Sequence, residues 1–237
     1  MQKLDYSSKD GFIDVPLIIK EGKKHELFPG LLSYIGTIRT MDFPLFEKLG
    51  RVYLDNAATS QEPQSVINRM HEYRKTHIRG SSHSENSAEA REAHEKFAET
   101  RKKVANFFNS GNYYAVFTSG TTGASNSIAS RFPFEKGDML LLTEMEHNSQ
   151  ILTARNCARK AGSEIAYVEA SMPEGRLNLE HLESILYKRK KGRVLFNLVH
   201  VSNLTGVVNP VKEIRKIMDE TVGDRGFIYL DMAQSAG

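Results

Sequence analysis

The sequence predicts an α/β fold of three layers, in which helices cover both faces of a mainly parallel sheet. Two observations predict it. From residue 51 onward, short apolar runs alternate with amphipathic segments. The runs in the middle of the chain are continuously apolar, which is typical of parallel strands buried on both faces. The expected strands are residues 51–54, 113–118, 138–143, 164–169, 194–201 and 227–231.

Helices are expected where apolar residues recur every three or four positions. Asn178 is the expected N-cap of one helix. The pair Asn209-Pro210 places a cap and a first-position proline at the start of the last helix. The expected helices are residues 61–79, 87–108, 121–131, 147–161, 178–188 and 210–220.

The chain is expected to divide into an N-terminal arm, residues 1–50, and a large domain, residues 51–237. The arm is rich in glycine and proline and has no sustained hydrophobic period, which indicates an irregular segment with short helical or extended pieces.

Composition narrows the class of protein. The chain has 237 residues, of which 40% are hydrophobic and 26% charged, as in a folded globular protein. The net charge of +3 is too small to indicate a nucleic-acid or membrane partner. The single cysteine, Cys157, excludes an internal disulfide and fits a reducing compartment. The apolar run at residues 15–19 is too short for a signal sequence, so we expect a cytoplasmic protein.

Polar residues follow four of the expected strands, where ligands bind in open α/β sheets. These segments are residues 119–123, 144–148, 202–206 and 231–234. Thr121 and Thr122 lie at a strand-to-helix junction beside glycines, which suits a phosphate group, although an ordinary turn has the same composition. Asp231 ends an apolar run and needs a cationic or N–H partner, unless it is a helix cap or an ordinary ion pair. His147 begins a helix and is either functional or a packing residue.

Other reactive side chains give weaker signals. His71, His77 and His83 are spaced six apart, which does not match a helical metal pair, so no metal site is expected. Cys157 fits core packing in a helix. The basic run at residues 188–193 fits a solvated helix end.

Six segments, in this order, resemble the class V aminotransferase family of pyridoxal 5'-phosphate (PLP) enzymes, and within it the cysteine desulfurase and selenocysteine lyase branch. They are residues 53–59, 79–80, 119–122, 146–149, 200–206 and 231–235. The resemblance covers about residues 51–237. It implies the three-layer large domain of fold type I PLP enzymes and removal of sulfur or selenium from a small amino acid.

The resemblance also implies roles for single residues. Thr121 and Thr122 would hold the cofactor phosphate. His147, the expected catalytic residue, would stack on the pyridine ring. Asp231 would pair with the ring nitrogen and keep it protonated, so that the ring can act as an electron sink.

By the same resemblance, Asn203 and Gln234 would bind the phenolic-oxygen side of the ring. The family's Schiff-base lysine lies downstream of the segment around Asp231, and no lysine follows it here. Cys157 is not placed to be the family's nucleophilic cysteine. We therefore expect an incomplete enzyme that works as a homodimer or with a lysine-bearing partner chain, and that passes sulfur to an acceptor protein.

Three other functions remain open from the sequence. Aminotransferase-like or epimerase-like chemistry belongs to the same family. A non-catalytic or split-enzyme subunit would also fit the missing lysine. The segment at residues 118–123 matches the phosphate loop of adenylate-forming enzymes, although the lysine that usually follows that loop is absent.

Overall fold

The computed structural model describes residues 29–236 except Asn112 and Met172. The described residues form two compact units, divided between Ile78 and Arg79. The first holds the helices α2 (Pro29–Asp42), α3 (Pro44–Leu49) and α4 (Gln64–Thr76). The first 28 residues of the expected arm lie outside the described residues. Within the described residues, no helix is long and apolar enough to cross a membrane.

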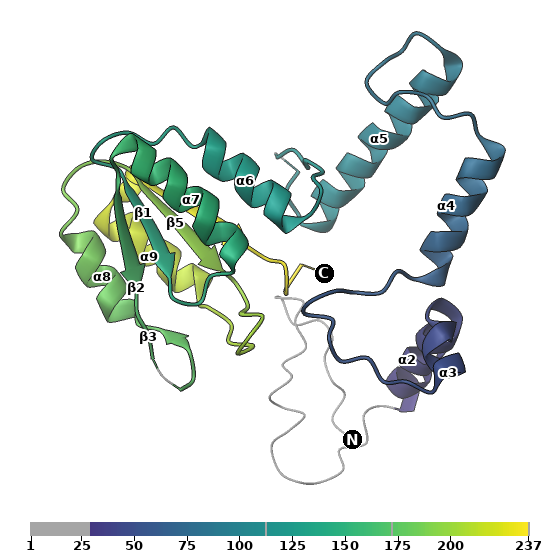
Figure 1. Ribbon diagram of the computed structural model, residues 1–237, viewed down its shortest axis with the longest axis horizontal. Helices are drawn as coiled ribbons and strands as arrows, with labels where there is room; N and C mark the ends of the chain where they lie inside the picture. Colours follow the sequence, from purple (N-terminus) through teal and green to yellow (C-terminus); the bar gives the residue numbers. More distant parts are fainter. Residues whose placement is uncertain (1–28, 112, 172, 237) are drawn as a thin grey trace. The chain divides into compact units, whose positions relative to one another are not determined.

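The second unit is built on a four-stranded parallel sheet in the order β2-β1-β5-β6 (Figure 1). The strands are β1 (Met139–Thr143), β2 (Glu164–Val168), β5 (Val194–Val199) and β6 (Gly226–Asp231). A small antiparallel hairpin, β3 (Ala170–Ser171) and β4 (Arg176–Leu177), follows β2. The expected mainly parallel α/β fold is confirmed.

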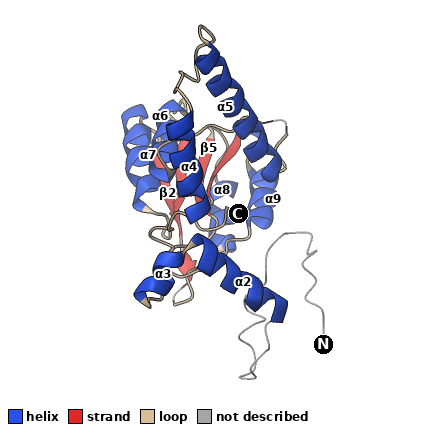
Figure 2. Cartoon of the chain, turned by 90° about the vertical axis from the view of Figure 1, so that its right-hand side faces the viewer, coloured by secondary structure: helices blue, strands red, loops and turns tan. Residues whose placement is uncertain are grey.

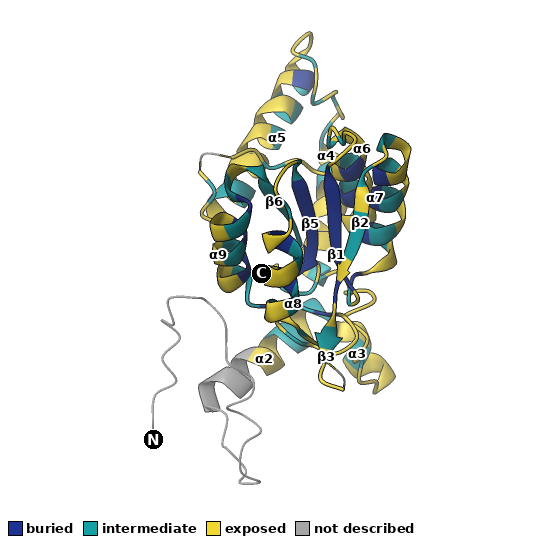
Figure 3. Cartoon of the chain, turned by 90° about the vertical axis from the view of Figure 1, so that its left-hand side faces the viewer, coloured by how far each residue is buried: buried dark blue, intermediate teal, exposed yellow. Residues whose placement is uncertain are grey.

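Helices cover both faces of this sheet, which gives the expected three layers (Figure 2). The helices α6 (Thr121–Arg131) and α7 (Asn148–Ala161) pack on one face, and α8 (Leu179–Tyr187) and α9 (Val211–Thr221) on the other. Successive side chains of β1 point to opposite faces of the sheet. Leu140 packs toward α6 and α7, and Leu141 packs toward α8 and α9. Residues of β1 and β5 are buried on both faces (Figure 3), which explains their uninterrupted apolar sequence.

Local sequence accounts for the helix ends. The Ser87 side chain accepts a hydrogen bond from Ala90 N at 3.1 Å and so caps α5 (Ala88–Phe107). Asn178 caps α8 as expected, accepting from His181 N at 3.0 Å. A short 3-10 helix, Gly223–Arg225, leads from α9 into β6. The expected helices occur within three residues of their predicted bounds.

Two predicted strands are wrong. Residues 51–54 and 113–118 are not strands in this structure. Their sequences are apolar, but Leu54 is 88% and Tyr114 96% exposed, and neither segment pairs with a strand within the described residues. Phe117 instead packs edge-on against Phe97 of α5, with ring centroids 5.6 Å apart.

The predicted cap at Asn209 is also wrong. Its Nδ2 donates to the carbonyl of Val199 at 2.7 Å, and Pro210 occupies the N-cap position of α9 without a side-chain hydrogen bond. Asn209 is buried, so its amide binds the nearby main-chain carbonyl at the end of β5, which would otherwise lack a partner.

The basic run at residues 188–193 is more than a solvated helix end. Arg189 Nη1 pairs with Glu164 at 2.7 Å, and Arg193 Nη2 pairs with Asp138 at the same distance. Asp138 and Arg193 immediately precede β1 and β5, so this ion pair fastens the amino ends of the two central strands.

Candidate functional site

The candidate site lies at the carboxyl edge of the sheet. Because β1, β5 and β6 are parallel, their last residues reach the same edge, and Val199 is in register with Asp231. The polar segments that follow these strands therefore start close together. The expected placement of candidate residues at strand ends thus holds for β1, β5 and β6, but not for residues 119–123, because residues 113–118 are not a strand.

Asp231 is the last residue of β6 and is only 4% exposed. Its Oδ1 accepts a hydrogen bond from Ala233 N at 2.9 Å, and its main-chain carbonyl accepts one from His200 N at 2.8 Å. Among the described residues, no cationic side chain forms an ion pair with this carboxylate. A buried carboxylate that has no ion-pair partner is stabilised when a cationic N–H group binds to it.

Thr121 and Thr122 form the first turn of α6. The N-cap, Gly120, adopts φ +119° and has no side chain, so no side-chain cap binds the first N–H groups of the helix within the part of the chain that the structure describes. At Gly123, an added Cβ would lie 2.6 Å from Ser119 Oγ, so the Ser119 hydroxyl would have to rotate away. Both threonines are exposed. The arrangement suits a phosphate at a helix N-terminus.

A partly buried hydrogen bond joins this helix start to β6. Ser125 Oγ lies 2.7 Å from the hydroxyl of Tyr229 and also donates to Thr121 O at 2.9 Å. Tyr229 precedes Asp231 by two residues, so both side chains are on the same face of β6. The first turn of α6 and the carboxylate of Asp231 therefore face the same region.

His147 is the N-cap of α7 and is exposed. Its Nδ1 accepts a hydrogen bond from Ser149 N at 3.2 Å and lies 2.8 Å from Ser149 Oγ. These contacts orient the exposed ring. In sequence, the residue immediately follows Glu146, which is anchored to β5.

Glu146 is a further candidate residue of this site, to which the sequence assigned no role. Its side chain is buried, and Oε1 accepts hydrogen bonds from Thr143 Oγ1 at 2.8 Å and from Val199 N at 3.0 Å. Burial raises the pKa of this carboxyl to about 7; the Val199 and Thr143 hydrogen bonds oppose that rise, and the charge of Asp231 adds to it. Glu146 begins the segment 146–149 that carries part of the family resemblance, but nothing in the sequence indicates that this carboxyl is buried while Glu144, two residues earlier, is exposed.

Asn203 and Gln234 lie in the loops after β5 and β6. Ser202 Oγ accepts from Leu204 N at 3.3 Å and shapes the turn that carries the exposed Asn203. His200 Nδ1 lies 2.8 Å from Ser235 Oγ, which links the two loops. The roles of Asn203 and Gln234 toward a ligand stay predictions.

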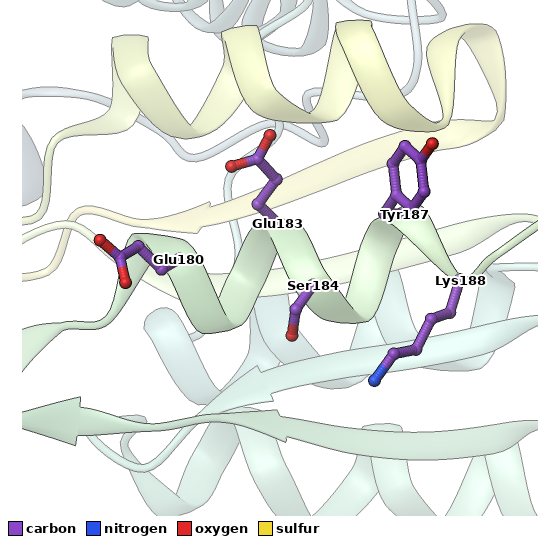
Figure 4. A pocket seen from close by; sticks show the side chains of 5 residues that line it. All are labelled: Glu180, Glu183, Ser184, Tyr187 and Lys188. Atoms are coloured by element: carbon purple, nitrogen blue, oxygen red, sulfur yellow. The ribbon is translucent and has the colours of Figure 1, made fainter.

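A separate hollow lies on α8 and does not belong to this site (Figure 4). Its side chains come from α8 and its C-cap, and they recur every three or four residues along the solvent-exposed side of the helix. They are Glu180, Glu183, Ser184, Tyr187 and Lys188. The candidate residues at the strand ends are not among them.

The fold and this polar cluster define a class: an α/β protein with candidate ligand-binding groups at the carboxyl edge of a parallel sheet. The chain belongs to the class V aminotransferase family, whose model matches residues 52–237. The expected family is therefore confirmed. The match includes the segment at residues 118–123 on which the adenylate-forming alternative depends.

Relatives within this family are cysteine desulfurases. The chain is 36% identical to the cysteine desulfurase of Haloferax volcanii over 193 residues, which cover 78% of this chain and 42% of the relative. It is 34% identical to a probable cysteine desulfurase of Pyrococcus abyssi over 198 residues, which cover 83% of this chain and 47% of the relative. The chain thus spans a little under half the length of these relatives.

A solved structure shows the same fold. The apo cysteine desulfurase of Thermococcus onnurineus superimposes with a TM-score of 0.73 at 31% sequence identity, covering 85% of this chain and 48% of that one. The described sheet and helices are therefore part of the fold of this enzyme group.

Proposed function

We propose that this chain supplies the PLP-binding part of an enzyme that removes sulfur or selenium from a small amino acid, as cysteine desulfurases and selenocysteine lyases do. The main observation in its favour is the side chain of Asp231. It is a buried carboxylate at the end of β6, close to the start of α6, and has no ion-pair partner among the described residues. Membership of the class V aminotransferase family and relatives named cysteine desulfurase support the proposal.

The residues at this edge fit PLP by their chemistry. Thr121 and Thr122, with the uncapped N–H groups of α6, would bind the phosphate. Asp231 would accept a hydrogen bond from the ring nitrogen and keep it protonated. When bound, PLP supplies an electron sink for charge that develops on the substrate carbon.

The remaining candidate residues would orient the ring. His147 would stack on one face, held by its contacts with Ser149. Asn203 and Gln234 would donate to the phenolic-oxygen side from the loops after β5 and β6. The chain's own contribution is thus to bind and orient the cofactor and to maintain its charge.

By the family resemblance, the complete enzyme would need a lysine downstream of Asp231 to hold the cofactor and a nucleophilic cysteine to take up sulfur, and Cys157 is not placed for that second role. We propose that they belong to the same protein downstream or to a lysine-bearing partner chain, and that the enzyme acts as a homodimer in the cytoplasm. A sulfur acceptor protein would be its macromolecular partner.

Isolation of the protein from its native source tests this function. The expected result is bound PLP and formation of alanine from L-cysteine or L-selenocysteine. An isolate that contains PLP but instead produces a keto acid or a D-amino acid would contradict removal of sulfur or selenium. It would favour the aminotransferase-like or epimerase-like chemistry of the same family.

Replacing both Thr121 and Thr122 with valine is expected to weaken binding of pyridoxamine 5'-phosphate about tenfold, because two hydroxyl donors to a charged phosphate are lost. This ligand has no aldehyde, so it cannot react with surface lysines. Binding of pyridoxamine, which lacks the phosphate, should not change. Fluorescence titration of both ligands measures the difference.

Thr100→Val is the matched control, because the Thr100 hydroxyl donates to Lys96 O within α5 at 2.7 Å. It should leave both affinities unchanged. Equal weakening of the phosphorylated and unphosphorylated ligands by the double substitution would show that the threonines do not bind phosphate.

A further inference from the structure

Glu146 joins three elements at the edge of the candidate site. Its Oε1 accepts from the side chain of Thr143 at the end of β1 and from the main chain of Val199 at the end of β5. The next residue, His147, caps α7. The buried carboxyl therefore ties the loop that carries His147 to the two central strands of the sheet.

The two oxygens of this carboxyl are not equivalent. Oε1 has two donors, whereas Oε2 is buried and has no hydrogen-bond partner among the described residues. An ionised oxygen in that position lacks both water and a donor, which disfavours charge. A proton on Oε2 would remove the cost of the buried charge and leave the two hydrogen bonds to Oε1 intact.

A second carboxylate lies on the neighbouring strand. Asp231 is in register with Val199, whose N–H donates to Glu146. The negative charge of Asp231 raises the pKa of Glu146 further. Tyr229, also on β6, and His200, whose N–H donates to the Asp231 carbonyl, are further titratable groups here, and the Tyr229 hydroxyl contacts Ser125 of α6. Both carboxyl groups are buried and like charges repel, which favours a state in which Glu146 keeps its proton.

We propose that Glu146 is a positioning residue of the cofactor site, which holds the His147 loop against β5 and releases a proton when a cationic ring nitrogen pairs with Asp231. This inference rests on the proposed function. The O–H bond of Glu146 breaks without any redox change, and the proton passes to solvent. The ring cation offsets the charge of Asp231, so the second carboxylate can form at lower electrostatic cost.

By linkage, a ligand that displaces a proton binds more tightly as the pH rises. Affinity for pyridoxamine 5'-phosphate should therefore rise across neutral pH, by about threefold to tenfold from Glu146. The phosphate of the ligand titrates as well, but it does so equally in every variant. The contribution of Glu146 is therefore the difference in the pH dependence of affinity between wild type and a variant that lacks this carboxyl.

The test compares wild type with Glu146→Gln. The amide oxygen of glutamine can still accept from Thr143 and Val199, and its NH₂ group stands where the protonated Oε2 would be. Binding of pyridoxamine 5'-phosphate is measured by calorimetry across neutral pH, in two buffers of different ionisation enthalpy. Glu144→Gln is the matched control, because Glu144 is exposed in the same loop.

We expect wild type and Glu144→Gln to release protons on binding. Glu146→Gln should release fewer protons, and its affinity should change less with pH. Equal proton release and parallel pH profiles in all three proteins would overturn the role of Glu146 alone. Absence of saturable binding in wild type at every pH would overturn the proposed function, and this inference with it.

A second measurement needs no variant that might fold poorly. Carboxyl carbon-13 NMR of wild type follows the titration of Glu146 with and without pyridoxamine 5'-phosphate. The titration midpoint of Glu146 should move to lower pH when the ligand is bound. A midpoint that does not move would contradict proton release.

Discussion

Asp231→Ala is expected to weaken binding of pyridoxamine 5'-phosphate by about 100-fold, because it removes a buried ionic acceptor for the ring nitrogen. The carboxylate is held in place by Ala233 N and by the pairing of β6 with β5, so it is pre-organised for this bond. Ala233 is exposed, so water can satisfy its N–H in the variant and the fold should remain intact. Fluorescence titration measures the affinity, and urea unfolding checks the fold.

Asp231→Asn separates charge from shape. The amide oxygen of asparagine can still accept from Ala233 N, so any loss of affinity reports the missing charge. It should weaken binding nearly as much as alanine does. Asp224→Ala, an exposed change before β6, should leave affinity unchanged. Wild-type affinity in Asp231→Asn would mean that the carboxylate does not pair with a cationic ring.

Asp138→Ala is expected to lower the free energy of unfolding by about 3 kcal/mol, because it leaves the partly buried Arg193 without its partner. Asp138 Oδ1 accepts from Arg193 N at 2.8 Å, and Oδ2 accepts from Glu135 N at 2.9 Å and from the guanidinium. The substitution therefore removes an ion pair and two main-chain hydrogen bonds from the amino ends of β1 and β5. Urea unfolding at neutral pH measures the loss.

The same pair predicts an acid dependence. Burial raises the pKa of Asp138, but the hydrogen bonds and charge of Arg193 outweigh it, and the net pKa is lowered from 3.8. Its stabilising contribution is therefore present above the unfolded-state pKa and is lost as the pH falls through the folded-state pKa. The stability difference between wild type and Asp138→Ala should shrink on acidification.

Glu135→Ala is the control for this prediction. Glu135 also lies near Arg193, at 3.3 Å, but its side chain is 77% exposed, and such surface pairs contribute little. Its removal should change stability by less than about 0.5 kcal/mol. Equal losses from Asp138→Ala and Glu135→Ala would show that burial of the ion pair has no special importance.

Much of the fold can be predicted from hydrophobic pattern alone. The runs at β1 and β5 are apolar at nearly every position because both faces of the sheet are covered, and Asn178 marks the start of α8. The predictions of strands at residues 51–54 and 113–118 are wrong because neither segment pairs with another strand within the described residues. An apolar run becomes a strand only where another strand accepts its hydrogen bonds, and pairing partners cannot be read from local sequence.

The placement of the candidate site could also be predicted, because parallel strands bring their carboxyl ends to one edge. Asp231 and His147 could be singled out as strand-end and helix-start residues. Glu146 could not, since its burial depends on Val199, which is 53 residues away in the sequence. The pairing of Arg193 with Asp138, across 55 residues, was hidden for the same reason.

A crystal structure of the chain with pyridoxamine 5'-phosphate would decide whether the carboxyl edge of this sheet is a cofactor site. We expect the phosphate on the first turn of α6 at Thr121 and Thr122, and the ring nitrogen within hydrogen-bond distance of the Asp231 carboxylate. His147 should lie against one face of the ring. A ligand bound elsewhere, or bound at this edge with its ring nitrogen away from Asp231, would contradict the proposed site.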